Sequence, residues 1–135
     1  MLRLTEQQYQ AIQGRTKEGV SLPVPKNTDP FARMNKTEKR YAQILEAKRK
    51  AGEIKDWKFE SINLQLSKPD KAAKQKGTYY RTDFIVITDC IEIHEVKGGF
   101  IMEDADLKFK IAREMYPWFR FVMMQYKKGN WLRVR

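Results

Sequence analysis

Two short apolar segments constrain the fold of this chain more than any other feature. Residues 82–87 and 91–98 are rich in Ile, Val and Phe and are separated by three polar or small residues. This pattern predicts two strands joined as a β-hairpin. Side chains two positions apart on a strand share a face, so Glu95 and Lys97 should point the same way. Asp83 should lie on the paired strand.

The charged residues of this hairpin are of the types that phosphodiester chemistry uses. Two carboxylates that face one cleft form a hard-oxygen site for Mg²⁺ or Mn²⁺, and a neighbouring ammonium group can stabilise a phosphate. Asp83, Glu95 and Lys97 therefore indicate a metal-dependent phosphodiesterase. The hairpin alone leaves a second interpretation open, in which Asp83 merely ends a strand and Glu95 and Lys97 form an ordinary ion pair.

The charge of the chain is large and unevenly distributed. The 135 residues include 27 Lys and Arg against 17 Asp and Glu, which gives a net charge of +10. Residues 82–106 contain seven acidic residues and one basic residue, so the rest of the chain carries a net charge of +16. A basic protein with an acidic centre suits a nucleic-acid partner and bound cations. The alternative is that the basic residues are only solvated charges on helix surfaces, with no anionic partner.

The chain has one cysteine, Cys90, and one histidine, His94. A single cysteine excludes an intrachain disulfide and fits a reducing cytoplasm. His94 alternates with Glu95, so we expect it on the opposite face of the strand, and we expect Cys90 and His94 to fill the core or the surface. No apolar run is long enough to span a membrane, the N-terminus lacks a signal peptide, and no clustered ligands indicate zinc.

The residue pattern divides the chain into an N-terminal region, 1–34, and a folded domain, 35–135. In the first region, residues 5–13 predict a short helix, and residues 14–30 predict an extended arm because they contain several glycines and prolines. The folded domain should begin with a helix that starts at Asn35 and ends near residue 51. Asn or Thr at its start and Glu38 in its first turn provide the capping signal.

Besides the two hairpin strands, the rest of the domain predicts three further strands and a second helix. We expect the helix to bury Leu107, Ile111 and Met115, which recur at helical spacing. The expected segments are a strand over 57–66, a lysine-rich loop over 68–77, the hairpin strands, a helix over 104–115, and strands over 119–126 and 131–134. The order αβββαβ plus a C-terminal strand predicts an α/β fold with a mixed central sheet flanked by helices.

This order and four charged residues resemble the PD-(D/E)xK nuclease superfamily, whose core is the restriction-endonuclease-like fold. Its signature, an acid near one strand and acid-x-Lys on the next, is matched by Asp83 and by Glu95-Val96-Lys97. Its additional acid on the first core helix is matched by Glu38. The resemblance covers about residues 35–135. Thr82 stands where the superfamily's proline would be, and many resolvase-like members also lack this proline.

Within that superfamily, the chain is most similar to small phage-encoded endonucleases and Holliday-junction-resolvase-like proteins. The similarity rests on Tyr80-Arg81-Thr82-Asp83-Phe84 and on Glu95-Val96-Lys97-Gly98. It implies a Mg²⁺-dependent endodeoxyribonuclease that tolerates Mn²⁺ and selects branched or junction DNA by shape. Such a protein would work in the cytoplasm, which is that of the host cell if a phage encodes it.

The resemblance also implies roles for the matched residues. Asp83, Glu95 and the carbonyl of Val96 would hold the metal ion, and Glu38 would bind a second cation or orient water. Lys97 would lie beside the attacking water and the scissile phosphate, where it would stabilise negative charge.

Other residues are expected to contact DNA. For Lys108 the alternative is an exposed helix lysine, and for Tyr79 and Tyr80 the alternative to base stacking is the edge of the core. Gln125 lies on the strand expected next to the catalytic pair. The basic contacts are expected from Lys68, Lys71, Lys74, Lys76, Arg81 and Lys108.

Two other functions stay open, a catalytically inactive nucleic-acid-binding protein of the same fold and an RNA-processing nuclease. The presence of all four site residues argues against the first, because acids that repel phosphate add nothing to binding. Cutting two strands with one site per chain predicts a homodimer. The arm before Asn35, Trp118 and Trp131 are candidate contacts in that dimer, although the two tryptophans could equally fill the core.

Overall fold

The structure is a computed structural model that describes residues 5, 7 and 29–135. The helix expected over residues 5–13 and the arm expected over 14–30 fall almost entirely outside the described residues. The chain divides into two units, Met1–Ala32 and Arg33–Arg135, and the second contains the expected site. Within the described part of the chain, no helix has the length and apolar character needed to cross a membrane.

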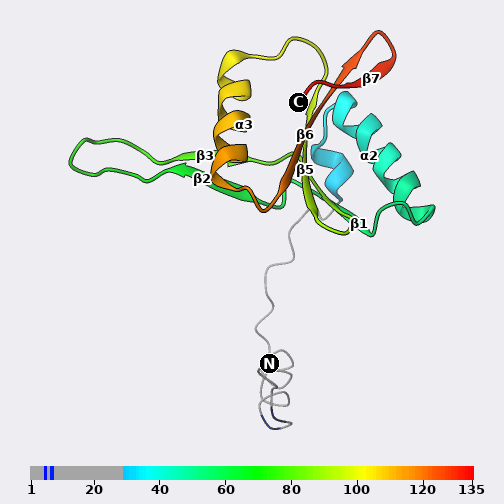
Figure 1. Ribbon diagram of the computed structural model, residues 1–135, viewed down its shortest axis with the longest axis horizontal. Coiled ribbons are helices and arrows are strands. Elements are labelled where there is room, and N and C mark those ends of the chain that lie inside the picture. Colours follow the sequence, from blue (N-terminus) through cyan, green and yellow to red (C-terminus); the bar gives the residue numbers. More distant parts are fainter. Residues whose placement is uncertain (1–4, 6, 8–28) are drawn as a thin grey trace. The chain divides into compact units, whose positions relative to one another are not determined.

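The described elements form a five-stranded sheet, a two-stranded sheet and two α-helices (Figure 1). The large sheet has the order β1-β4-β5-β6-β7, and β2 and β3 form the small one. In the large sheet, β5 and β6 are parallel and the other neighbours are antiparallel, which confirms the expected mixed sheet. The elements are η1 (Pro30–Arg33), α2 (Lys36–Lys50), β1 (Asp56–Phe59), β2 (Asn63–Ser67), β3 (Thr78–Arg81), β4 (Phe84–Ile87), β5 (Ile91–Lys97), α3 (Glu103–Met115), β6 (Arg120–Lys127) and β7 (Asn130–Arg133).

The prediction of one strand over residues 57–66 is wrong, because these residues form two strands in different sheets. β1 pairs with β4, whereas β2 pairs with β3. The break follows β1 at Glu60, whose φ of +46° is unusual for a residue with a side chain and turns the chain out of the sheet. Because β2 and β3 form a hairpin inserted between β1 and β4, the large sheet still has three strands before α3 and two after it.

The two helices cover opposite faces of the large sheet (Figure 1). On one face, Phe109 of α3 packs with Ile93 and Met123 of neighbouring strands, and all three are fully buried. On the other face, Tyr41 of α2 packs edge-on against Phe84, with 5.4 Å between ring centroids. The alternation of side chains along a strand therefore gives each helix its own apolar layer.

The start of α2 is set by a capping box. The side chain of Asn35 accepts a hydrogen bond from the N–H of Glu38, and the Glu38 carboxylate accepts one from the N–H of Asn35. This arrangement confirms the expected helix start and satisfies two N–H groups that the helix itself cannot bond. It also holds Glu38 at the amino end of α2.

The face of α3 that packs on the sheet differs from the expected one. Leu107 and Met115 are 54% and 46% exposed, whereas Phe109 and Ala112 are fully buried. The helix offers two apolar stripes, and the large ring of Phe109 decides between them because it packs edge-on against Tyr80 and Phe121. The choice therefore depends on contacts with strands that are distant in the sequence.

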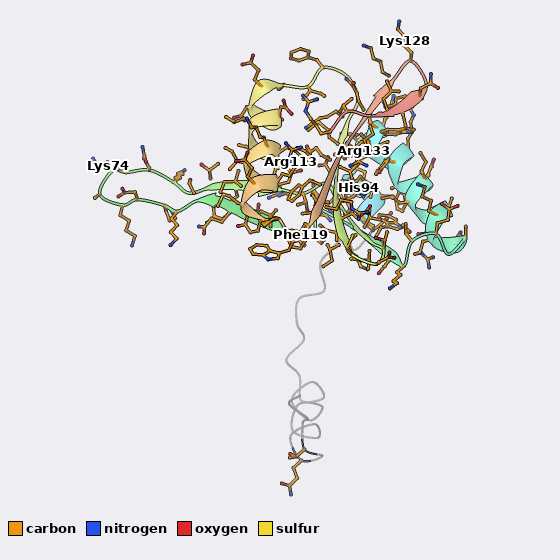
Figure 2. The ribbon with its side chains drawn as sticks, viewed as in Figure 1. Lys74, His94, Arg113, Phe119, Lys128 and Arg133 are labelled. Atoms are coloured by element: carbon orange, nitrogen blue, oxygen red, sulfur yellow. The ribbon has the colours of Figure 1, made fainter. Side chains whose placement is uncertain are left out.

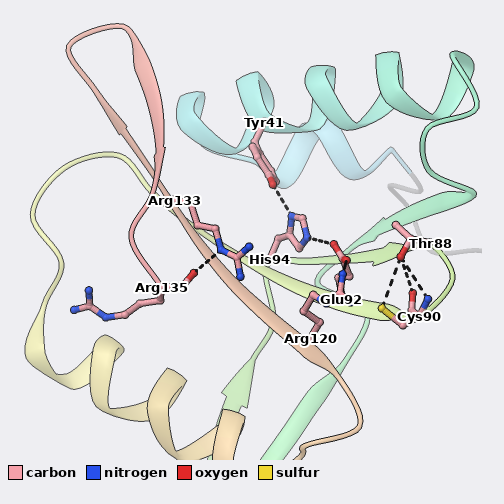
Figure 3. A network of polar contacts seen from close by, with 8 residues as sticks. All are labelled: Tyr41, Thr88, Cys90, Glu92, His94, Arg120, Arg133 and Arg135. Carbon is pink, nitrogen blue, oxygen red and sulfur yellow. Dashed lines mark hydrogen bonds and ion pairs between the residues drawn. The ribbon is translucent and has the colours of Figure 1, made fainter.

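His94 lies on the face of β5 opposite Glu95, as expected, and takes part in a buried polar network (Figure 3). Its Nε2 lies 2.9 Å from Oε1 of Glu92, and its Nδ1 is bonded to the hydroxyl of Tyr41. An ionised carboxylate can only accept, so Nε2 carries the proton and Nδ1 accepts from Tyr41. Burial lowers the pKa of His94, which agrees with a neutral ring. His94 is thus a hydrogen-bonded core residue.

Candidate metal centre and adjoining cleft

Asp83 lies at the corner where the chain passes from the small sheet to the large one. The residue before it, Thr82, is fully buried, and both its N–H and its hydroxyl donate to the carbonyl oxygen of Ile62, at 3.1 and 3.0 Å. This double anchor ties the corner to the residue just before β2, and Asp83 itself reaches β5. There, Oδ2 of Asp83 accepts the N–H of Val96 at 2.9 Å.

Glu95 and Lys97 share one face of β5, as their spacing predicts. Nζ of Lys97 lies 2.8 Å from Oε1 of Glu95, and the hydroxyl of Tyr80 donates to Oε2 of Glu95 at 2.6 Å. Glu95 is only 6% exposed and Tyr80 only 5%. Tyr80 is therefore not a base-stacking residue but a buried donor that positions Glu95. The sequence did not indicate this role, because Tyr80 belongs to a different sheet from Glu95.

The pKa of Asp83 indicates that the acidic side chains gather at one place. Burial and, after it, the charges of Glu95 and Glu38 raise its pKa to about 8, against the opposing effects of the Val96 N–H and the charge of Lys97. Residues from α2, from the corner before β4 and from β5 therefore share one electrostatic environment. The four predicted site residues, Glu38, Asp83, Glu95 and Lys97, all take part in it.

Glu38 is half-buried, and burial raises its pKa. Its hydrogen bond with the N–H of Asn35 lowers the pKa, whereas the charges of Glu60 and Glu95 raise it. Glu60 is an acid at the site that sequence analysis missed. Its carboxylate lies 3.5 Å from Arg33, and its N–H donates to the carbonyl of Asp83 at 2.8 Å. Nothing in the sequence indicated Glu60, because the turn that places it beside Glu38 was not predicted.

The carboxylates do not form a ready coordination shell. Among the described residues, no group of three or more His, Cys, Asp or Glu side chains is placed so that it could hold a metal ion. The oxygens bond to protein donors instead: Glu95 to Tyr80 and Lys97, Asp83 to Val96, and Glu38 to Asn35. Binding a cation would therefore require these carboxylates to exchange donors for the metal.

The chemistry of the donors nevertheless fits a hard divalent cation. Burial and, after it, the negative charges of Glu95 and Glu38 raise the pKa of Asp83, and a bound cation would offset the repulsion among these three carboxylates. The N–H of Val96 points to Asp83, and the N–H and C=O of a strand residue point to the same edge. The carbonyl of Val96 therefore opens toward the Asp83 side, where the resemblance places a ligand.

Close packing at Gly98 joins the end of β5 to the start of α2. A side-chain carbon added at Gly98 would collide with the side chain of Thr37, whereas one added at Gly99 would meet nothing within 4 Å. A glycine at position 98 thus allows the amino end of α2, which carries Glu38, to approach the strand that carries Glu95 and Lys97.

We expect Gly98→Ala to reduce the free energy of unfolding by about 1–3 kcal/mol, the usual effect of forcing an extra methyl group into a packed site. Gly99→Ala is the matched control and should change it by less than about 0.5 kcal/mol. Urea unfolding of both variants measures the difference. Equal stability of the two variants would show that α2 and β5 do not need this close approach.

A cleft of about 270 Å³ adjoins Glu95. Two of the expected DNA-contacting residues, Arg81 and Lys108, line it together with Tyr79 and Tyr80. Nζ of Lys108 lies 3.6 Å from Oδ2 of Asp104 one turn earlier, so the lysine is held on the cleft side of α3. The structure therefore brings Arg81 and Lys108 next to the acidic site.

The four loop lysines occupy a different region. Lys68, Lys71, Lys74 and Lys76 are all exposed along the β2–β3 hairpin. Asp70 and Gln75 form a bridge near its end, and Lys74 lies at the tip that projects away from α3 (Figure 2). These lysines form a basic arm, Lys68–Lys76, and none of the four lines the cleft beside Glu95.

Three further residues named in the sequence analysis have clear positions. Gln125 is opposite Lys97 in the parallel β5–β6 pair, and its Nε2 donates to the carbonyl of Gly99 at 2.6 Å. Trp118 is 75% exposed. Trp131 is half-buried between two tyrosine rings, so of the two tryptophans Trp118 is the more available for contacts.

Comparisons of the chain with protein-family models, with curated proteins and with solved structures found no match. The resemblance to the PD-(D/E)xK superfamily therefore remains a prediction from sequence.

Proposed function

We propose that this protein is a metal-dependent DNA endonuclease that hydrolyses phosphodiester bonds. The observation that carries the proposal is the convergence of Glu38, Asp83 and Glu95 with Lys97 at one end of β5, beside a cleft lined by Arg81 and Lys108. Three acids would only repel a phosphate unless a cation joined them. The arrangement therefore favours cation-assisted chemistry over simple binding.

Asp83, Glu95 and the Val96 carbonyl would hold Mg²⁺ or Mn²⁺, with Glu38 as a further carboxylate. Bound there, the cation would supply Lewis acidity to a phosphodiester and favour ionisation of a water molecule. Tyr80 keeps Glu95 oriented by donating to its Oε2 at 2.6 Å, and Val96 does the same for Asp83 at 2.9 Å. Both orienting donors belong to β-strands, which limits the movement of the two acids.

Lys97 would serve as a cation rather than as a base. Burial alone would lower its pKa, but its hydrogen bond with Glu95 and the charges of Glu95, Asp83 and Glu38 raise the pKa above its ordinary value. The ammonium group therefore stays protonated at neutral pH. It can exchange its bond with Glu95 for one with a phosphate oxygen and stabilise the charge that develops there during hydrolysis.

DNA selection would depend on shape and backbone charge. The basic arm carries four exposed lysines, and Arg81 and Lys108 lie where a phosphate could approach Glu95. Phosphate contacts of this kind position a nucleic acid without reading its sequence. We therefore propose a preference for branched or junction DNA, and we propose that a homodimer makes paired cuts.

Cleavage of labelled substrates tests this proposal. Branched, duplex and single-stranded DNA and a matched RNA should be incubated with the protein and Mg²⁺, and we expect the branched DNA to be cut fastest. Faster cleavage of the RNA would favour the RNA-processing alternative. Binding to all substrates without cleavage would favour an inactive nucleic-acid-binding protein.

Binding should fall steeply with salt concentration. Each phosphate that a lysine neutralises releases condensed counterions, and a protein with several such contacts loses about 10³-fold or more in affinity between 50 and 200 mM salt. Replacing all four arm lysines by Gln should weaken binding for every sequence and reduce the salt dependence. Fluorescence anisotropy measures both effects, and an affinity that barely changes with salt would contradict the expected phosphate contacts.

A further inference from the structure

An exposed aromatic side chain lies just beyond the candidate site. Phe100 is 88% exposed and Met102 is 66% exposed, although burying a phenylalanine is normally favourable by about 1.5–3 kcal/mol. Both belong to the loop that joins β5 to α3 (Figure 1). Ile101, between them, packs against the core under α3. The loop therefore turns one apolar residue inward and presents its two neighbours to solvent.

The loop is held at several points, so Phe100 is presented from an anchored backbone. The carbonyl of Gly99 accepts the side-chain amide of Gln125 at 2.6 Å. The carbonyl of Met102 accepts the N–H of Asp106 in the first turn of α3, at 3.0 Å. Ile101 anchors the segment between these two bonds. Ordering Phe100 on a ligand would therefore cost little further backbone entropy.

Phe100 stands beside a cation in an open groove. Gly99, Phe100, Ile101, Gln125 and Lys127 line a space of about 470 Å³. Proteins that bind single-stranded nucleic acid combine aromatic rings, on which bases stack, with cations that follow the backbone. Phe100 and Lys127 supply one group of each kind. The chain is also strongly basic outside residues 82–106, which favours a polyanion over an apolar protein partner.

We propose that this groove is a base-stacking subsite, in which Phe100 stacks on an unpaired nucleobase and Lys127 contacts the adjoining phosphate. Phe100 follows Lys97 by three residues, so their Cα atoms are at most about 11 Å apart. The stacked base would thus lie close to the phosphate that is cut. This inference rests on the proposed nuclease function, and it identifies the substrate as DNA with unpaired bases near the cleavage point.

Binding of oligonucleotides that contain 2-aminopurine at an unpaired position tests the subsite. The measurements use the full chain with Ca²⁺ in place of Mg²⁺, and they compare a branched substrate with a fully paired duplex. The variants are Phe100→Ala, Phe100→Tyr and the control Trp118→Ala, which removes another exposed ring at the other end of α3. Thermal unfolding of each variant checks that the fold is intact, as expected for exposed positions.

We expect Phe100→Ala to lose between about 5-fold and about 150-fold in affinity for the branched substrate, the range found when one stacking ring is removed. Its affinity for the duplex should stay unchanged, Phe100→Tyr should bind like the original protein, and Trp118→Ala should show no effect. Among the three variants, only Phe100→Ala should abolish the quenching of 2-aminopurine fluorescence.

Three results separate failure of this inference from failure of the nuclease proposal. If the original protein binds and cuts branched DNA but Phe100→Ala does so equally well, the subsite is wrong and the nuclease proposal stands. If the original protein binds none of the DNA substrates, both are wrong. If Phe100→Ala instead changes the oligomeric state measured by light scattering, the groove is a contact between copies of the chain and the subsite is overturned.

Discussion

Asp83→Asn, Glu95→Gln and Lys97→Ala should each reduce DNA cleavage by at least about 100-fold, because in the proposed nuclease each would remove a group that acts on the reacting phosphate or its cation. DNA affinity should change little, since the proposal assigns these side chains to the hydrolysis step and not to DNA binding. Removing an acid should even strengthen binding slightly by reducing repulsion of phosphate. Single-turnover cleavage and anisotropy in the presence of Ca²⁺ measure the two effects separately.

The matched control for these variants is Glu92→Gln. Glu92 lies on the same strand as Glu95 but bonds with His94 and Arg120 in the polar network away from the site (Figure 3). It should therefore keep cleavage within a few-fold of the original protein. Glu95→Gln retains an oxygen that can accept from Tyr80, so its loss of cleavage would not reflect unfolding. Near-normal cleavage by this variant would eliminate the proposed site.

The metal-free protein should lose several kcal/mol of stability as the pH rises from about 4 to about 8. Burial and the charges of Glu95 and Glu38 raise the pKa of Asp83 to about 8, against an ordinary value near 3.8. Between these values Asp83 is protonated in the folded protein and ionised in the unfolded chain. The folded state then binds more protons, so the free energy of unfolding falls by up to about 1.4 kcal/mol for each pH unit in this range.

Urea unfolding in EDTA at a series of pH values measures this effect. Asp83→Asn cannot ionise at this position, so the variant should be more stable than the original protein at pH 8 and the advantage should shrink toward pH 5. Mg²⁺ should raise the melting temperature of the original protein at pH 8 but not that of Asp83→Asn. Parallel pH profiles for the two proteins, with no effect of Mg²⁺, would show that the carboxylates do not share one site.

Features set by local sequence could be predicted for this fold. The β4–β5 hairpin follows from its two apolar segments and its short polar turn, and α2 follows from the capping signal of Asn35 and Glu38. The shared face of Glu95 and Lys97 follows from the strand period alone. These interactions join residues that are close in the sequence, so the sequence pattern contains them.

Features set by distant contacts could not be predicted. The turn at Glu60 divides one expected strand into two strands of different sheets. Its φ is positive, but the residue is not a glycine, so the sequence does not indicate the turn. The buried face of α3 depends on how Phe109 packs against Tyr80 and Phe121 from other strands. The hydrogen bond from Tyr80 to Glu95 likewise joins two different sheets. The sequence could thus predict that Glu38, Asp83, Glu95 and Lys97 come together, but not which groups orient them.

The dependence of cleavage on divalent cations tests the central claim most directly. A branched DNA substrate should be incubated with the protein in Mg²⁺, Mn²⁺, Ca²⁺ or excess EDTA, with Asp83→Asn as the matched inactive control for contaminating nucleases. We predict cleavage in Mg²⁺ and Mn²⁺, binding without cleavage in Ca²⁺, which is the poorer Lewis acid, and neither cleavage in EDTA nor cleavage by the variant. Robust cleavage in excess EDTA, or equal cleavage by Asp83→Asn in Mg²⁺, would contradict the account.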